Sequence, residues 1–142
     1  MINIGLLGCG TVGSGVVELL QKNADIIAQR TGDTITLKKV LDKDRDKCRA
    51  LGIPEDMLAT DFNDIINDPD INIVVELIGG IEPAFTFIIE AMRTGKHVVT
   101  ANKDLIAVKG KELFETAREK GIDFYFEASV AGGIPIVYPL KQ

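Results

Sequence analysis

Short apolar runs alternate with longer amphipathic segments along most of the chain. Five of these runs have the length and composition of buried strands, and they occupy residues 2–7, 35–41, 72–78, 97–100 and 123–128. Strands that alternate with helices are typical of βαβ units, in which neighbouring strands run parallel. The pattern therefore predicts an α/β fold with a mostly parallel sheet and helices on both faces.

The segments between these runs show patterns that predict helices. A helix is predicted over residues 11–23, because apolar side chains recur there at three- and four-residue spacing. Two short helical pieces are expected in "DKCRALG" and "DFNDIIND". Another helix should follow Pro83 and end at Gly95, and a last one should span about residues 110–120 and end at Gly121.

The first strand leads directly into the glycine-rich stretch "NIGLLGCGTVGSG". Gly8, Gly10 and Gly13 form G-x-G-x-x-G between a strand and a helix, which is the context of the dinucleotide-binding fingerprint. Gly8 permits a tight turn, Gly10 lets a pyrophosphate approach the backbone, and Gly13 lets the helix lie close to the strand. The motif predicts a Rossmann-type, doubly wound fold that binds NAD or NADP. A turn whose glycines serve packing alone is the alternative.

An acidic residue follows the second strand. Asp42 stands where a carboxylate can bind the ribose diol of the adenosine, although it lies 29 positions after Gly13 rather than the usual 20 or so. Lys43 and Arg45 follow at once and can compensate the charge of a 2′-phosphate. NAD is therefore favoured over NADP only modestly, and an ordinary solvated turn is the alternative.

The reactive end of a ligand in such a fold lies over the carboxyl ends of the strands. Gly79 and Gly80 follow the third strand and would leave room for the nicotinamide side, unless they simply form a turn. Thr100 ends the fourth strand, and Lys103 follows it. An ammonium group there can polarise a carbonyl oxygen or transfer a proton, whereas a solvated surface lysine is the alternative.

Length, charge and cysteine content limit the classes of molecule that the protein is expected to bind. The 142 residues fit one domain, their formal net charge is −5, and there is no basic run, which disfavours nucleic acid and anionic membranes and favours a small-molecule substrate. Cys9 and Cys48 do not form a metal-binding or disulfide pattern and are expected in or near the core. No signal peptide or membrane span is recognised, so the protein is predicted to be cytoplasmic.

Four motifs occur in a specific order: "GLLGCGTVGSGV", "VVELIGGIEPA", "VVTANKDL" and "FEASVAGGIPI". With these motifs the chain resembles the N-terminal part of homoserine dehydrogenase over essentially its whole length. The resemblance implies reversible hydride transfer between NAD(P)H and L-aspartate 4-semialdehyde, which yields L-homoserine for threonine, methionine and isoleucine biosynthesis. It also implies that Thr11 and Val12 contact the pyrophosphate, that Thr100 lies near the nicotinamide, and that Lys103 is one of two active-site lysines.

The same resemblance implies a monovalent cation, usually sodium, after the fifth strand. The matching positions are Glu127, Val130, Gly132 and Ile134, and Ala131 stands where many relatives have glycine. Residues 1–129 would form the NAD(P)-binding domain, and residues 130–142 would begin the connection to a missing catalytic and dimerisation domain. The chain is thus expected to be truncated and inactive alone, and the longer protein is expected to be a homodimer.

Two other functions remain open at this point. Another two-domain NAD(P)-dependent dehydrogenase would use the same nucleotide-binding fold, because a fold does not fix the chemistry. A non-catalytic NAD-binding sensor or assembly module would need no second domain.

Overall fold

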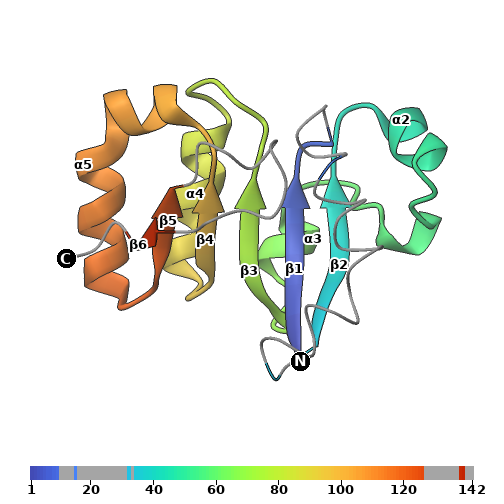
Figure 1. The fold of residues 1–142 in the computed structure, drawn as a ribbon, viewed down its shortest axis with the longest axis horizontal. Helices are drawn as coiled ribbons and strands as arrows, with labels where there is room; N and C mark the ends of the chain where they lie inside the picture. Colours follow the sequence, from blue (N-terminus) through green and yellow to red (C-terminus); the bar gives the residue numbers. More distant parts are fainter. Residues whose placement is uncertain (10–14, 16–31, 33, 127–137, 140–142) are drawn as a thin grey trace.

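One sheet organises the molecule (Figure 1). The computed structural model describes residues 1–9, 15, 32, 34–126 and 138–139, and in this part of the chain six strands lie in the order β2-β1-β3-β4-β5-β6. The first five pair in parallel, and β6 pairs antiparallel with β5. The strands are β1 (Ile2–Leu7), β2 (Ile35–Leu41), β3 (Ile71–Glu76), β4 (His97–Thr100), β5 (Phe124–Phe126) and β6 (Tyr138–Pro139). The predicted doubly wound, mostly parallel α/β fold is confirmed.

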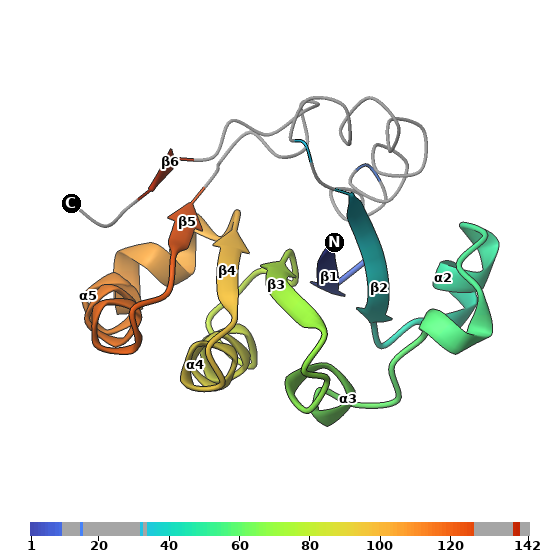
Figure 2. The same ribbon diagram turned by 90° about the horizontal axis from the view of Figure 1, so that it is seen from below.

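The described helices are arranged mainly on one face of the sheet. Figure 2 shows α3, α4 and α5 side by side on that face, and α2 beyond the edge strand β2. The helix predicted over residues 11–23 lies outside the described residues. The bounds are α2 (Arg45–Ala50), the 3₁₀ helix η1 (Glu55–Met57), α3 (Asn63–Ile66), α4 (Ala84–Arg93) and α5 (Lys103–Lys120).

Two apolar clusters lie on opposite faces of the sheet, because successive side chains of a strand point to opposite sides. In β1, Leu7 belongs to the cluster beneath α3, α4 and α5, whereas Leu6 belongs to the other. The second cluster includes Val40 of β2 and Cys48 of α2. Cys9 is buried there too, so the two cysteines are core residues, as predicted.

Side-chain hydrogen bonds explain two of the boundaries that differ from the sequence-based prediction. Helix α5 begins at Lys103 rather than near residue 110, because the Asn102 side chain accepts a hydrogen bond from the Leu105 amide and caps the helix. Strand β3 ends at Glu76 rather than at residue 78, because the Glu76 carboxylate accepts a hydrogen bond from the Ile78 amide and the chain turns there.

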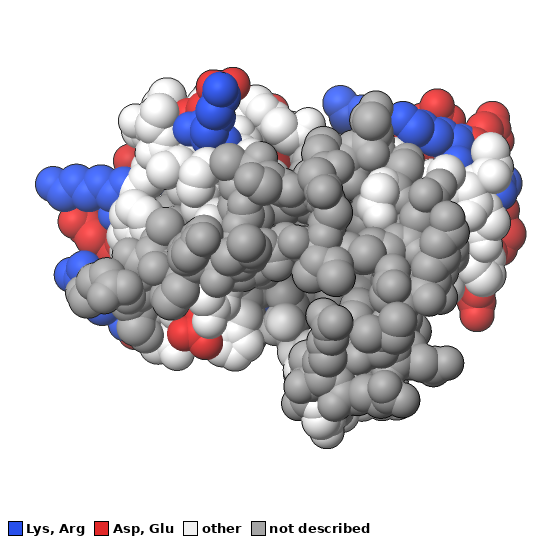
Figure 3. All heavy atoms as spheres, viewed as in Figure 1, with Lys and Arg blue, Asp and Glu red and all other residues white. Residues whose placement is uncertain are grey.

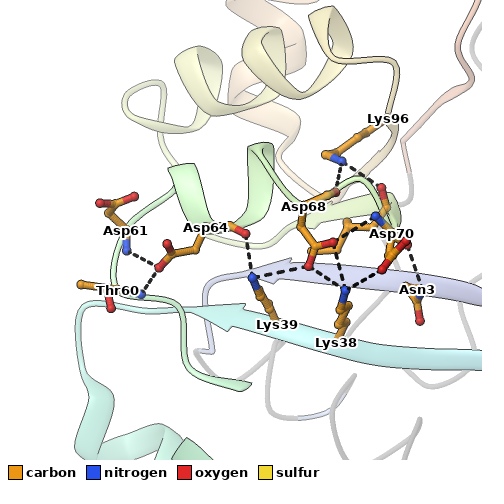
Figure 4. Close-up of polar contacts among 10 residues, drawn as sticks. Asn3, Lys38, Lys39, Thr60, Asp61, Asp64, Asp68, Asp70 and Lys96 are labelled. Atoms are coloured by element: carbon orange, nitrogen blue, oxygen red, sulfur yellow. Dashed lines mark hydrogen bonds and ion pairs between the residues drawn. The ribbon is translucent and has the colours of Figure 1, made fainter. Parts of the chain in front are cut away.

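A polar cluster joins β2 to the loops that precede β3 and β4 (Figure 4). The register between β1 and β2 shifts at Ile4 and Gly5, so Lys38 is an extra residue in β2. This bulge allows two consecutive lysines to reach the same carboxylate. Lys38 Nζ lies 2.8 Å and Lys39 Nζ 3.4 Å from Asp68 Oδ2. We call Lys38, Lys39, Asp68, Asp70 and Lys96 the amino-edge cluster.

Their surroundings shift the pKa values of Asp68 and Lys96 in the amino-edge cluster. Burial alone would raise the pKa of Asp68, but the hydrogen bond from Lys38 and the other contacts of the carboxylate outweigh it and lower this pKa. Burial lowers the pKa of Lys96, whose ammonium donates to the carbonyl oxygens of Asp68 and Ile71 at 2.7 and 2.9 Å. The cluster therefore ties the amino ends of β3 and β4 to β2.

The surface carries charges of both signs. On the face shown in Figure 3, the described Lys and Arg side chains lie beside Asp and Glu rather than in one basic area. No helix in the described ranges is long and apolar enough to cross a membrane.

Candidate dinucleotide-binding site

The strands end in a single row across the sheet. Leu7 pairs with both Leu41 and Glu76, Glu76 pairs with Thr100, and Thr100 pairs with Phe126. The residues that follow β1, β2, β3 and β4 therefore emerge at the same carboxyl edge. This edge is where ligands bind in open α/β sheets, at the point where the chain turns from one side of β1 to the other.

A cavity of about 650 Å³ opens at this edge where β1, β2 and β3 end. Its described wall combines strand-end backbone, apolar side chains of the β3–α4 region and several charged groups after β2. The residues are Gly8, Cys9, Leu41, Asp42, Lys43, Asp44, Arg45, Lys47, Ala59, Thr60, Asp61, Phe62, Leu77, Ile78, Pro83 and Phe87. A cavity of this size is in the range of small-molecule and cofactor sites.

Gly8 forms the floor of the turn after β1. Its φ of +94° is one that side-chain-bearing residues rarely adopt. A Cβ at this position would lie 3.1 Å from backbone atoms of Leu77 and Ile78, so the end of β3 packs directly against the glycine. The Gly8 amide donates to the Leu41 carbonyl at 2.8 Å, which ties the turn to β2 as well.

Asp42 is held by backbone amides on both of its oxygens. Oδ2 accepts from the Cys9 amide, and Oδ1 accepts from the Asp44 amide at 2.9 Å. A carboxylate oxygen has a further lone pair, so both oxygens can still accept from a ligand hydroxyl. Asp42 therefore faces the cavity as a fixed acceptor.

Positive charge lies next to Asp42. Lys43 and Lys47 are exposed and line the cavity, and the Arg45 guanidinium donates to the Ala59 carbonyl at 2.9 Å. This hydrogen bond holds the partly exposed Arg45 side chain at the cavity wall.

The thiols of Cys9 and Cys48 lie beneath Asp42. The two sulfur atoms and a carboxylate oxygen of Asp42 are all within 4.8 Å of one another. Burial raises the pKa of Cys9 to about 12 and also raises the pKa of Cys48. Both thiols are thus neutral near pH 7 and act as part of the core.

A second group of polar contacts surrounds the ends of β3 and β4. The fully buried Glu76 accepts from the amides of Ile78 and Gly79 at 2.8 and 3.1 Å through Oε2. Its Oε1 accepts from the Thr100 hydroxyl at 2.6 Å. The Thr100 oxygen in turn accepts from the Asn102 amide at 3.1 Å.

Asn102 completes this group at the start of α5. Its side chain donates to the Gly80 carbonyl at 2.6 Å and caps the helix through Leu105. Lys103 is the first residue of α5 and is exposed at the same edge. Gly79 and Gly80 have φ of +82° and +71°, and among the described residues no atom lies within 4 Å of where a Cβ on either would be. They form a turn with an open surface.

A family model agrees with this arrangement. Residues 8–127 match the model described as "Homoserine dehydrogenase, NAD binding domain". The chain belongs to this family. The resemblance seen in the four sequence motifs is thereby confirmed, and the other two-domain dehydrogenases considered above are disfavoured.

Individual homoserine dehydrogenases are similar along almost the whole chain. The enzyme of Bacillus subtilis is 52% identical over 141 residues, which are 99% of this chain and 33% of that enzyme. The enzyme of Synechocystis is 48% identical, with 99% and 32% covered. The crystal structure of a homoserine dehydrogenase from Thiobacillus denitrificans superposes with a TM-score of 0.83 at 47% identity and covers 90% of this chain and 30% of that one. The chain spans about a third of the length of these relatives.

The structure divides the predicted cofactor residues of this homoserine dehydrogenase domain into groups. Gly8, Asp42 and Lys43 share the cavity. A second group lies at the ends of β3 and β4 and consists of Gly79, Gly80, Thr100 and Lys103. Among the described residues that line the cavity, none belongs to this second group. The remaining predicted residues lie outside the described part of the chain: Gly10, Thr11, Val12, Gly13, Glu127, Val130, Gly132 and Ile134.

Glu76 is the polar residue that sequence reasoning missed. It lies in the run "INIVVELIGG", where one carboxylate follows buried apolar residues and precedes two glycines by three positions. A charged side chain is almost never fully buried unless it is paired or hydrogen-bonded, so its place in a central strand was a usable signal. Thr100 is fully buried as well, and both of its hydroxyl contacts are within the protein.

Proposed function

We propose that this chain binds NAD or NADP at its carboxyl edge as the cofactor-binding part of a homoserine dehydrogenase, which interconverts L-homoserine and L-aspartate 4-semialdehyde. The observation that carries the proposal is the cavity beside Gly8 and Asp42, in a chain of the homoserine dehydrogenase NAD-binding family. The fixed acceptors of Asp42 suit the adenosine half of a dinucleotide, and the positive φ of Gly8 forms the turn beside them.

Cofactor binding is assigned to three sets of residues in this proposal. Asp42 binds the adenosine ribose, and Lys43 beside it tolerates a 2′-phosphate, so both NAD and NADP fit. The nicotinamide end lies over the Gly79–Gly80 turn and near Thr100. The pyrophosphate lies on the glycine-rich turn at Gly10, Thr11, Val12 and Gly13.

Lys103 carries the protein's part of the chemistry. The bound cofactor donates or accepts the hydride. During reduction the aldehyde oxygen gains negative charge, and the exposed ammonium of Lys103 at the start of α5 stabilises that charge and supplies a proton. The substrate pocket and a second lysine would belong to the two thirds of the relatives that this chain does not match.

The wider setting follows from the same proposal. The longer protein would be a cytoplasmic homodimer in threonine, methionine and isoleucine biosynthesis. Residues 1–129 would form the nucleotide-binding domain, and residues 130–142 would start the connection to the catalytic domain. Sodium would bind Glu127 and the backbone oxygens of Val130, Gly132 and Ile134, because oxygen ligands suit a hard cation.

Titration of the chain with NADH, followed by calorimetry, tests the proposal. The wild-type chain should bind NADH, and Asp42→Ala should weaken binding about tenfold or more, because a ribose acceptor and the anchor of the Cys9 and Asp44 amides are both lost. Glu112→Ala on the exposed side of α5 is the matched control and should bind as the wild type does. Absence of NADH binding by the wild-type chain would refute the proposed function.

A further inference from the structure

Two strand-end carboxylates organise the carboxyl edge in the same way. Asp42 accepts from the amide two residues ahead of it, at Asp44, and Glu76 does so from Ile78. Each also holds a neighbouring strand: Asp42 through the Cys9 amide after β1, and Glu76 through the Thr100 hydroxyl of β4. The two acids differ in access, because Asp42 lines the cavity whereas Glu76 is fully buried.

Asp42 can therefore contact a ligand, whereas Glu76 can affect a ligand only through the residues that it holds in place. We propose that Glu76 is a positioning residue for the nicotinamide half of the cofactor site, which shapes the Gly79–Gly80 turn and the start of α5 without contacting the cofactor. The inference rests on the proposed function, since it refers to the same cofactor. It assigns the two halves of the site to two separate anchors, Asp42 and Glu76.

The first link runs from Glu76 to the turn. Two successive glycines with positive φ, and with no described atom near the position of a Cβ, give this turn little intrinsic restraint. Its shape is held at the front by Glu76 Oε2, which binds the Ile78 and Gly79 amides, and at the back by Asn102, which donates to the Gly80 carbonyl. Without the carboxylate the front of the turn has no side-chain anchor among the described residues.

The second link runs from Glu76 to α5. The Thr100 hydroxyl has one proton, which it donates to Glu76 Oε1, and its oxygen accepts from the Asn102 amide. Asn102 then caps α5, whose first residue is Lys103. Two hydrogen-bonded residues, Thr100 and Asn102, therefore connect the buried acid in β3 to the residue that carries the proposed chemistry.

Replacement of Glu76 by glutamine breaks one of these two links and leaves the volume of the side chain nearly unchanged. Glu76 accepts three hydrogen bonds, and glutamine offers one acceptor oxygen and one NH₂ group. If the NH₂ faces the Ile78 and Gly79 amides, donors meet donors. If it faces Thr100, the hydroxyl proton loses its acceptor. In either orientation the nicotinamide half is disturbed, and the contacts of Asp42 are left intact.

The experiment compares two ligands on the same chain. NADH needs both halves of the site, whereas ADP needs only the adenosine half. Glu76→Gln should lower NADH affinity about tenfold or more, the effect of a hydrogen-bond partner lost in a buried site, and should change ADP affinity less than about twofold. Amide hydrogen exchange at Ile78 and Gly79 should become faster in the same variant.

A matched control and a second variant complete the design. Asp68→Asn removes the charge of another buried carboxylate, in the amino-edge cluster, and should lower the thermal unfolding midpoint while both affinities stay unchanged. Thr100→Val removes the hydroxyl without changing the shape of the side chain. It should reproduce the selective loss of NADH affinity, and it serves as the test if Glu76→Gln does not fold.

Each outcome discriminates. An equal loss of NADH and ADP affinity would mean general destabilisation and would overturn the positioning role, as would unchanged NADH affinity in a folded variant. If the wild-type chain binds ADP and NADH but the Glu76 and Thr100 variants show no selective loss of NADH affinity, the positioning role of Glu76 is refuted and the proposed function stands. If the wild-type chain binds neither ligand, the proposed function fails and the role of Glu76 fails with it.

Discussion

Replacement of Gly8 by alanine should destabilise the fold through two separable effects. The first is the backbone, because φ is +94° and a residue with a Cβ pays about 1–2 kcal/mol in left-handed conformations. The second is contact, because the new Cβ would lie 3.1 Å from the Leu77 carbonyl group and the Ile78 nitrogen. These are backbone atoms of a strand end, which cannot rotate away, and overpacking of this kind costs about 1–3 kcal/mol. The total loss should be about 2–5 kcal/mol.

Gly52→Ala provides the matched control. Gly52 also has a positive φ, +83°, but a Cβ there would meet no atom of the described part of the chain within 4 Å, so only the backbone effect applies. Urea unfolding of both variants and the wild type measures the free energies of unfolding, provided that the slopes with urea agree. Gly8→Ala should lose about 1–3 kcal/mol more than Gly52→Ala. Equal losses in the two variants would refute the claim that close packing against β3 requires glycine at position 8.

Three further outcomes are expected. Asp42→Ala should raise the ratio of NADP to NAD affinity, because the carboxylate beside Lys43 disfavours a 2′-phosphate, and an unchanged ratio would exclude Asp42 as the ribose ligand. In a chimera of this chain with the remaining two thirds of the Bacillus subtilis enzyme, Lys103→Ala should lower kcat about 10²-fold or more, and a near-normal kcat would contradict the role of Lys103. At pH 8, Cys9 and Cys48 should be alkylated far more slowly in the native chain than in urea, because burial raises both pKa values and the thiolate is the reactive form; similar rates would place both thiols outside the core.

Three strands could be predicted from the sequence with their bounds. β1, β2 and β4 span the expected residues 2–7, 35–41 and 97–100, because most positions of each run carry apolar or β-branched side chains, which favour strands. The start of α5 could not be placed as well. Gly110 in the middle of this helix weakened the periodic signal, whereas the stronger signal, the Asn102 cap, depends on a side-chain hydrogen bond.

The sequence predicted residues whose place in the candidate site depends on their own position after a strand. It did not predict residues whose role depends on hydrogen-bond partners elsewhere in the fold. Asp42 follows a strand and lines the cavity, so position and charge were sufficient to find it. The role of Glu76 depends on donors in another strand and in a turn, and sequence spacing does not show that Thr100 lies opposite it. Register between β3 and β4 is information that only the folded sheet contains.

The amino-edge cluster has a consequence for how such a domain can evolve. Lys38, Asp68 and Lys96 join β2, β3 and β4 at the end of the sheet away from the cavity, so a large share of the polar cross-linking does not depend on the residues that would recognise a ligand. Substitutions after β2, including at Lys43, therefore leave these cross-links between the strands in place.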